Sequence, residues 1–240
     1  MTTPAPVLLD SPRANLPYQM ISWLVVWPLY RLLFRGRTAG GANVPMDGAL
    51  VVVANHGSHI DPPLLGHALG RPVAFMAKAE LFRVPLLGAI IRACGAYPVA
   101  RGASDREAIR TATDRLEEGW AIGVFIDGTR QRDGRVNAPQ AGAALLAARA
   151  GVPLLPVAII NSHRALGPGG GRLRLVPVHI RIGTPISPPQ SRRRPDLEAA
   201  TAACQQQIND LLEQGLVGSD DLLSARVPDA LPPSGADHDP

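Results

Sequence analysis

The residues best suited to chemistry lie in the segment 54–63, where a histidine and an aspartate stand close together in the sequence. The segment follows Leu50–Ala54, a continuous apolar run that is typical of a strand buried on both faces. Gly57 permits a sharp turn after His56, so we expect the chain to curl back and bring Asp61 to the imidazole. A carboxylate on one ring nitrogen fixes the tautomer and leaves the other nitrogen free to take a proton from a hydroxyl.

Three other interpretations of this segment stay open at the level of the sequence. In the first, Asp61 only caps the helix expected at 61–69, and His56 is an ordinary loop histidine. In the second, His56, His59 and Asp61 bind a metal ion, since two histidines and a carboxylate are suitable ligands. The other histidines considered, which are His67, His163 and His179, have no carboxylates at ligand spacing and so form no second cluster. The third, a serine hydrolase, is disfavoured because the pattern G-x-S-x-G is absent.

Two more segments place arginines directly after predicted strands. Arg101 follows the apolar stretch 97–100, and the stretch 123–130 runs from a strand into a turn. That turn contains Asp127, Gly128, Thr129 and Arg130. A threonine hydroxyl and an arginine fork both bond phosphate oxygens, although either arginine taken alone would also fit a surface ion pair. Because ligands of open parallel sheets bind at the carboxyl ends of the strands, a base and two arginines in one pocket suit a phosphorylated alcohol.

Strand-like and helix-like segments alternate along the chain from residue 49. The expected strands cover 50–54, 73–77, 97–100, 122–126 and 152–160, with at least one more within 172–183. The expected helices cover 61–69, 81–94, 104–118, 138–150 and 195–214. This alternation predicts an α/β fold with a mostly parallel central sheet flanked by helices.

The N-terminal region predicts a membrane-interface helix ahead of the main domain. Residues 20–34 are apolar and rich in aromatic side chains, but they are fewer than the roughly 20 residues of a spanning helix, and Pro28 and Arg31 interrupt them. Such a segment followed by arginines is typical of the headgroup boundary, the alternative being a docking helix of a soluble fold. We expect a polar tail at 1–17 that is no signal peptide, the anchor helix at 18–38, the main domain at 39–215 and a disordered tail at 216–240.

The composition narrows the classes of partner. The formal net charge of +4 favours an anionic partner such as a phospholipid. Aromatic residues make up only 4% of the chain, which argues against base stacking and hence against a nucleic acid partner. Cys94 and Cys204 stand far apart, so no disulfide framework is expected. Lys78 is the only lysine, which indicates either a specific role or chance on a solvated surface.

Taken together, these segments resemble the bacterial 1-acylglycerol-3-phosphate acyltransferase (lysophosphatidic acid acyltransferase) family. The family motif Asn-His-x(4)-Asp is matched by Asn55, His56 and Asp61, and the motif Phe-Pro-Glu-Gly-Thr-Arg by residues 125–130. An arginine after a Pro-Val pair is matched by Arg101, and an apolar strand with a central proline by residues 152–157. The likeness runs from about residue 44 to residue 183.

The resemblance implies transfer of a fatty acyl group from acyl-carrier protein or acyl-CoA to the sn-2 hydroxyl of 1-acylglycerol-3-phosphate, which gives phosphatidic acid in phospholipid biosynthesis. His56 and Asp61 would be the catalytic residues. The substrate-binding residues would be Lys78, Arg101, Asp127, Gly128, Thr129 and Arg130. No metal and no cofactor are implied, and the enzyme would lie on the cytoplasmic face of a bacterial membrane as a peripheral or monotopic protein.

The sequence departs from the family pattern at the third motif. Ile126 and Asp127 stand where the family has proline and glutamate, and no lysine follows in residues 137–142. Aspartate is one methylene shorter than glutamate, so any substrate contact or loop-bracing role must shift. The alternatives that stay open are another lysolipid or glycerol phosphate acceptor, a metal-dependent phosphoesterase built on the segment 54–63, and a lipid-binding relative without activity.

Overall fold

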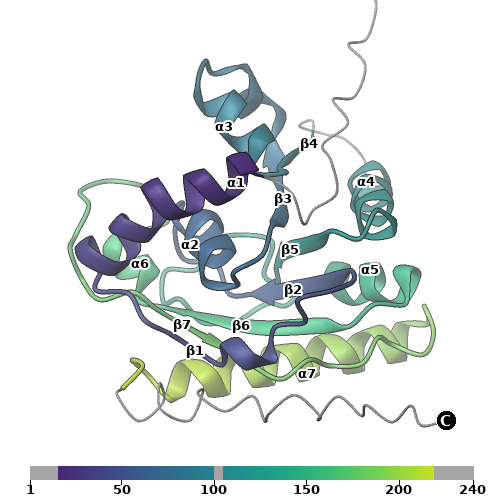
Figure 1. Ribbon diagram of the computed structural model, residues 1–240. Coiled ribbons are helices and arrows are strands. Elements are labelled where there is room, and N and C mark those ends of the chain that lie inside the picture. Colours follow the sequence, from purple (N-terminus) through teal and green to yellow (C-terminus); the bar gives the residue numbers. More distant parts are fainter. Residues whose placement is uncertain (1–15, 100–104, 219–240) are drawn as a thin grey trace, which may run out of the picture.

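Strand β2 (Leu50–Ala54) lies at the centre of the sheet in the computed structural model, which describes residues 16–99 and 105–218 (Figure 1). Within those ranges, seven strands form one sheet in the order β1-β7-β6-β2-β5-β3-β4. The other strands are β1 (Thr38–Ala39), β3 (Val73–Lys78), β4 (Tyr97–Val99), β5 (Ala121–Phe125), β6 (Leu154–Ile160) and β7 (His179–Ile182). Neighbouring strands run parallel except β6 and β7, so the predicted mostly parallel sheet is confirmed.

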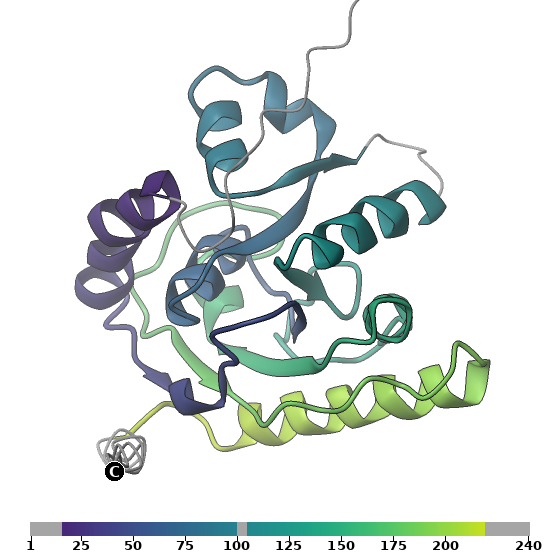
Figure 2. The ribbon, with the colours of Figure 1, turned by 45° about the vertical axis from the view of Figure 1, so that its right-hand side comes forward.

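Helices cover both faces of this sheet, as Figures 1 and 2 show. On one face lie α2 (Asp61–Ala68) and the helical N-terminal segment, and on the other lie α4 (Asp105–Glu117), α5 (Gly142–Ala150) and α7 (Arg194–Glu213). Two short helices, α3 (Leu87–Ala93) and α6 (Ser162–Ala165), follow β3 and β6 along the chain. Helices on both faces leave the central strands without solvent contact, which explains their unbroken apolar sequences.

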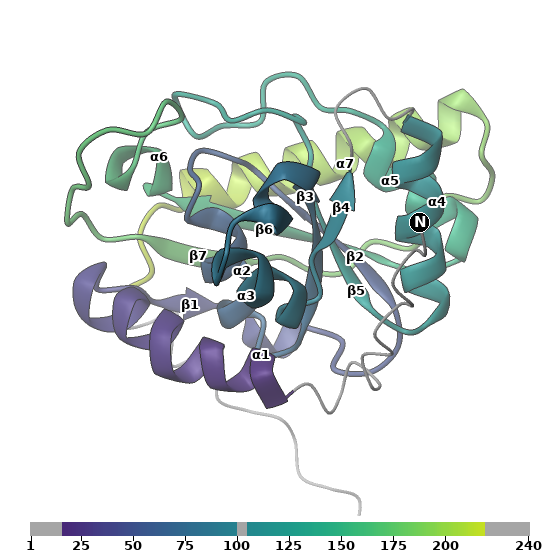
Figure 3. The same cartoon turned by 90° about the horizontal axis from the view of Figure 1, so that it is seen from above.

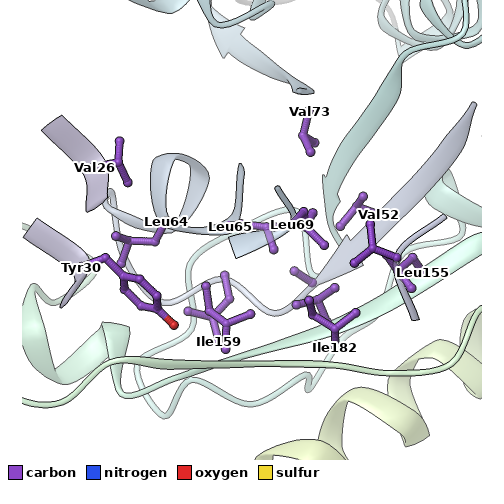
Figure 4. Packing of buried hydrophobic residues seen from close by; sticks show 14 of the residues in the cluster. Val26, Tyr30, Val52, Leu64, Leu65, Leu69, Val73, Leu155, Ile159 and Ile182 are labelled. Atoms are coloured by element: carbon purple, nitrogen blue, oxygen red, sulfur yellow. The ribbon is translucent and has the colours of Figure 1, made fainter. Parts of the chain in front are cut away.

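Side chains of β2 alternate between two apolar cores, one on each face of the sheet. Val52 belongs to the core beneath α2, together with Leu65 and Ile159 (Figure 4). Val51 and Val53 belong to the core on the opposite face, which α4, α5 and α7 cover. Burial on both sides fixes the position of β2, and with it the loop that begins at its carboxyl end.

The N-terminal helix is helical from residue 16 to residue 33 and consists of α1 (Leu16–Ile21) and two wide π-helical turns, Ser22–Val26 and Leu29–Leu33. The two π turns flank Pro28. Proline has no backbone N–H and its ring crowds the preceding turn, so a wider turn accommodates it within a continuous helix. The helix therefore ends earlier than the predicted segment 18–38, whose last residue, Thr38, begins β1.

One side of the N-terminal helix docks on α2. The Tyr18 hydroxyl donates to the Arg71 carbonyl at 3.2 Å, and Ser22 Oγ lies 2.8 Å from His67 Nδ1. The Tyr30 ring is buried and packs over Gly36, where a Cβ atom would lie 2.2 Å from the ring. Specific polar contacts and a glycine fitted to an aromatic ring show that this helix is part of the folded domain.

The other side of the N-terminal helix is apolar and exposed. Trp23 is 62% exposed, Leu24 is 69% exposed and Leu32 is 71% exposed. The sequence allowed a docking helix or a membrane-interface helix, and the structure has one side of the helix docked on the domain and the other side exposed. Among residues 16–99 and 105–218, no helix has both the length and the apolar character needed to cross a bilayer.

The segment predicted as one helix at 81–94 is broken in the structure. A 3-10 helix (Ala79–Arg83) and α3 are separated at Pro85 and Leu86. Leu86 has a φ of 64° and a ψ of −56°, a strained backbone conformation that interrupts any regular helix, and its side chain is 76% exposed. Apolar composition alone predicted a continuous helix here, but a proline and a strained leucine interrupt it.

The beginning of the predicted C-terminal tail packs against β7. Val217 is buried, and its N–H donates to His179 Nδ1 at 2.7 Å. The Arg181 guanidinium donates to the carbonyls of Gly215 at 2.9 Å and Leu216 at 3.2 Å. Residues 216–218 therefore belong to the folded part, whereas the rest of that tail, 219–240, lies outside the described residues. Of the tail predicted at 1–17, residues 1–15 also lie outside them, and residues 16 and 17 are the first residues of α1.

Candidate active site

The candidate site forms where β2 and β5 end side by side. Ala54 and Phe125, the last residues of these strands, are direct partners in the parallel register. The loop after Ala54 carries His56, and the loop after Phe125 carries residues 127–130. Adjacent parallel strands deliver their loops to the same edge of the sheet, so the two sequence motifs meet there.

Asp61 is fully buried and holds the imidazole of His56. Its Oδ2 lies 2.8 Å from His56 Nδ1 and accepts the backbone N–H groups of Gly57 and Ser58, each at 2.8 Å. Because Oδ2 accepts from Nδ1, the proton of the neutral ring resides on Nδ1 and the lone pair on Nε2. The predicted contact between the two side chains is present, and it leaves Nε2 as a base.

The role of Asp61 in α2 differs in detail from the predicted one. Asp61 is the first residue of the helix, and the capping position is held by Ile60, which makes no side-chain capping bond. The carboxylate bonds backward to the turn at Gly57 and Ser58 instead of forward to the helix. A negative charge at a helix N-terminus is favoured by the helix dipole, so the helix supports the carboxylate that orients His56.

The imidazole of His56 lies flat on the ring of Phe125. The two ring centres are 3.9 Å apart with an interplanar angle of 14°, and Phe75 stacks behind Phe125 at 5.7 Å. The side chain of His56 remains 17% exposed. Stacking on one face and the bond to Asp61 fix the ring in two directions while leaving part of it open.

Asn55, which the sequence offered only as part of a motif, is the residue that ties the loops together. Its Nδ2 donates to the carbonyls of Gly134 at 2.7 Å and Ile159 at 2.9 Å, and its Oδ1 accepts from the Ile159 N–H at 2.7 Å. The side chain is fully buried, so an amide with both a donor and an acceptor is required there. An amide at the end of an otherwise apolar strand is the sequence signal for such a clamp.

Asp127 turns toward its own loop. Its Oδ1 accepts the backbone N–H groups of Asn137 at 3.1 Å and Ala138 at 2.8 Å, and only 5% of the residue is exposed. The neighbouring Ile126 N–H donates to the Ala54 carbonyl at 3.0 Å, a bond that a proline in its place could not form. The sequence left two roles open for Asp127, a substrate contact and bracing of the loop, and these hydrogen bonds brace the loop.

Arg130 lies against a residue that the sequence suggested only as a metal ligand. The guanidinium contacts His59 Nε2. Partial burial and the positive charge of Arg130 lower the pKa of His59, which keeps the ring neutral and able to accept from the guanidinium. Arg130 thus has a polar partner that limits its rotation.

Lys78 is the last residue of β3 and is exposed. Its charge is close enough to His59 to contribute to the lowered pKa of that ring. Thr129 and Gly128 are exposed in the turn after β5, and Gly128 has a φ of 68°, which a glycine adopts without strain. Arg101 lies outside the described residues, two positions beyond Val99, which pairs with Lys78 in the parallel register.

The side chains considered for a metal site have different hydrogen-bond partners. His56 faces Asp61, whereas His59 faces Arg130, a cation that no metal site accommodates easily. Within the part of the chain that the structure describes, no group of three or more His, Cys, Asp or Glu side chains is arranged to hold a metal ion. The loops at the carboxyl ends of the strands instead bring His59 close to His56 and to two cations, Arg130 and Lys78.

Comparison with known proteins agrees with this arrangement. A family model described as "Acyltransferase" matches residues 37–160. A 1-acyl-sn-glycerol-3-phosphate acyltransferase of Bacillus subtilis is 30% identical over 176 residues, which cover 70% of this chain and 84% of the relative. A chloroplastic 1-acyl-sn-glycerol-3-phosphate acyltransferase of Brassica napus is 28% identical over 165 residues, or 67% of this chain and 46% of the relative.

Several of the curated relatives are much longer than the part that matches. The chain covers 46%, 45%, 56% and 50% of four of them, so it spans about half their length. Among solved structures, the 1-acyl-sn-glycerophosphate acyltransferase PlsC of Thermotoga maritima superposes with a TM-score of 0.68 at 26% identity, over 82% of this chain and 79% of that one. The matched model covers more than half of the 240 residues, and the chain belongs to the acyltransferase family.

Proposed function

We propose that this chain transfers an acyl group from a thioester to the sn-2 hydroxyl of 1-acylglycerol-3-phosphate, giving phosphatidic acid. The observation that carries the proposal is the pairing of His56 Nδ1 with the buried Asp61, which leaves Nε2 free at the open edge of the sheet. A base of this kind suits a hydroxyl that itself attacks the acyl group. The names of the relatives support this choice of acceptor.

The proposed reaction needs one general base and no covalent enzyme intermediate. His56 Nε2 takes the proton of the acceptor hydroxyl as its oxygen attacks the thioester carbonyl carbon. The tetrahedral intermediate collapses with cleavage of the carbon–sulfur bond, and the imidazolium returns the proton to the departing thiolate. Asp61 stabilises the imidazolium while the charge exists. Thioester and alcohol thus give ester and thiol, and the proposal includes no metal or other cofactor.

The acceptor phosphate is proposed to bind to the cations beside the base. Arg130 offers a planar fork for two phosphate oxygens, and Lys78 offers a mobile point charge. Thr129 and Gly128, in the exposed turn next to Arg130, provide a hydroxyl and a close approach of the backbone. Arg101 is included on the resemblance alone. Asp127 acts by bracing the turn from behind through Asn137 and Ala138.

A membrane surface is proposed as the place of reaction. The exposed side of the N-terminal helix carries Trp23, Leu24 and Leu32, and amphipathic tryptophans are favoured at the boundary between headgroups and acyl chains. A lysophospholipid is extracted most easily by a protein that already lies at that boundary. We place the protein on the cytoplasmic face, where acyl-carrier protein and acyl-CoA are made, and both remain candidate donors.

The test is an assay of the purified full chain with lysophosphatidic acid vesicles and each donor, with products identified by mass. We expect phosphatidic acid and free thiol in equal amounts, and a loss of at least 10²-fold in kcat for His56→Ala. Arg149→Ala, at an exposed position of α5, serves as the matched control and should keep full activity.

Two outcomes would contradict the proposal. The first is undiminished product formation by a folded His56→Ala protein, because the base is then elsewhere. The second is release of inorganic phosphate in place of acyl transfer, with activity that chelators abolish, which would support the phosphoesterase alternative. Product from an acceptor other than lysophosphatidic acid would keep the mechanism and change the substrate.

A further inference from the structure

The loop between α6 and β7 contains a short alternation of charge and apolar side chains. Residues 172–175 read Arg-Leu-Arg-Leu, and all four are exposed. Leu173 is 43% exposed and Leu175 is 55% exposed. The glycine-rich stretch 167–171 precedes them and connects them to α6. Four consecutive exposed residues of this composition have no role in the core and none in the proposed reaction.

This loop lies beside the end of the N-terminal helix. The Arg35 guanidinium donates to the Leu175 carbonyl at 3.1 Å, and the Val178 N–H donates to the Phe34 carbonyl at 3.0 Å. Figures 1 and 3 show the loop following α6 next to the last turn of the helix. In that last part of the helix, Leu29 and Leu32 are exposed as well. Two segments distant in sequence therefore form one apolar and basic surface.

The charge of this surface has a single sign. Residues 11–46 and 134–195, the stretches of sequence that contain the helix and the loop, include no aspartate or glutamate. They contribute arginines in both segments, among them Arg31, Arg35, Arg172 and Arg174, all exposed. In the described part of the chain, neither Arg172 nor Arg174 forms an ion pair. Arginines without ion pairs, on two segments that contain no acidic residue, create a positive potential that attracts an extended anionic surface.

From these observations we propose that the Arg172–Leu175 loop is a second membrane-binding element, which binds an anionic phospholipid bilayer together with the N-terminal helix. Its leucines enter the boundary between headgroups and acyl chains, and its arginines bind lipid phosphates. The continuity with Trp23 and Leu24 favours a bilayer over an acidic carrier protein, because exposed tryptophan and leucine on the same helix suit lipid. Two separated contacts would also fix the orientation of the domain on the membrane.

The experiment measures binding of the full chain to large unilamellar vesicles by sedimentation, with no substrate present. One set of vesicles contains phosphatidylcholine alone, and the other contains phosphatidylglycerol as well. The charge variant carries Arg172→Gln and Arg174→Gln. The matched control carries Arg192→Gln and Arg193→Gln, which removes two exposed arginines from the segment leading into α7, at the opposite end of the molecule (Figure 3). A third protein carries Leu173→Ser and Leu175→Ser.

We expect the charge variant to lose about 25-fold in affinity for the anionic vesicles, since each of the two arginines near such a surface contributes a factor of about five. The matched control should lose much less, and the difference between the two should vanish at high salt. The leucine variant should bind both kinds of vesicle more weakly. Equal losses for the charge variant and the matched control would overturn the proposal.

A carrier-protein surface is the other outcome that the experiment can reveal. If the charge variant binds vesicles as the unmodified protein does but loses activity only with the acyl-carrier protein donor, the loop binds that protein and the membrane proposal is wrong. Vesicle binding is measured without catalysis, so a failure of the proposed acyl transfer leaves this result unaffected. Conversely, activity with acyl-CoA and a monomeric short-chain acceptor tests the reaction without the membrane.

Discussion

A single oxygen, Asp61 Oδ2, holds both the imidazole of His56 and the turn that follows it. It accepts from the imidazole and from two backbone N–H groups of the turn at Gly57 and Ser58. The sequence predicted the pairing of His56 and Asp61 because glycine and proline at known positions restrict the path of the chain. It did not reveal the partner of Arg130 or the clamp at Asn55, since both contacts depend on residues far away in the chain.

The substitution Asp61→Asn separates the two roles of this carboxylate. The amide oxygen can still accept from the turn, but it brings no negative charge to stabilise the imidazolium. We expect kcat to fall by about 10² to 10⁴-fold with little change in stability. Asp61→Ala leaves three N–H groups without an acceptor and should also lower the free energy of unfolding by about 1–3 kcal/mol. Steady-state kinetics and urea unfolding measure the two effects.

A second prediction concerns His59, which the structure places against Arg130. Without this acceptor, the guanidinium of Arg130 explores more orientations and must be ordered when phosphate binds. His59→Ala should therefore raise the KM for the lysolipid by about three- to tenfold and leave kcat nearly unchanged. His59→Gln retains an acceptor and should restore most of the affinity. A drop in kcat with an unaltered KM would contradict this role.

Contacts between neighbouring strands support the side chains of the site. Gly123, in the middle of β5, lies under the ring of Phe75, which stacks on Phe125 and through it supports His56. Periodicity in the sequence predicted most strands and helices, because buried strands and capped helices have local signatures. It could not predict that β7 runs antiparallel to β6, or that Leu86 adopts a positive φ, since those follow from packing between distant segments.

The substitution Gly123→Ala tests the stack of rings. An added Cβ would lie 2.1 Å from Phe75 Cε1, so the ring must shift and disturb its stacking on Phe125. We expect a loss of about 1–3 kcal/mol in stability and a fall in kcat that exceeds what stability explains. Gly142→Ala, at the start of α5 with open space around it, is the matched control and should be neutral or slightly stabilising. Thermal unfolding and kinetics at a temperature where both proteins are folded give the comparison.

Across the whole molecule, histidines join segments that are far apart in sequence. His67 contacts the N-terminal helix through Ser22, and His179 connects the Arg35 carbonyl to the Val217 N–H. Burial is the largest cause of the lowered pKa of His67, His163 and His179. The neutral ring is therefore the form that the folded state favours at each of these positions.

This arrangement predicts loss of stability in mild acid. A histidine in the unfolded chain has a pKa of about 6.5, and the folded protein lowers the pKa of these three histidines below that value. As the pH falls, the unfolded state therefore binds more protons than the folded state. The contribution to stability is complete above about pH 7 and is lost as the pH falls through 6.5 and the lower folded-state values. Urea unfolding at pH 7.5 and 5.5 measures the effect, and His179→Gln should reduce the pH dependence. Stability that does not change over this range would contradict the prediction.

The docking of the N-terminal helix on α2 has a practical consequence for protein engineering. The helix covers the side of α2 that carries Leu64, and α2 begins at the residue that orients the base. Truncating the chain ahead of β1, a common step for removing apolar segments before crystallisation, would uncover that apolar side and weaken the support of Asp61. Replacing Trp23, Leu24 and Leu32 with polar residues would instead remove the exposed apolar surface and leave the buried side of the helix packed against the core.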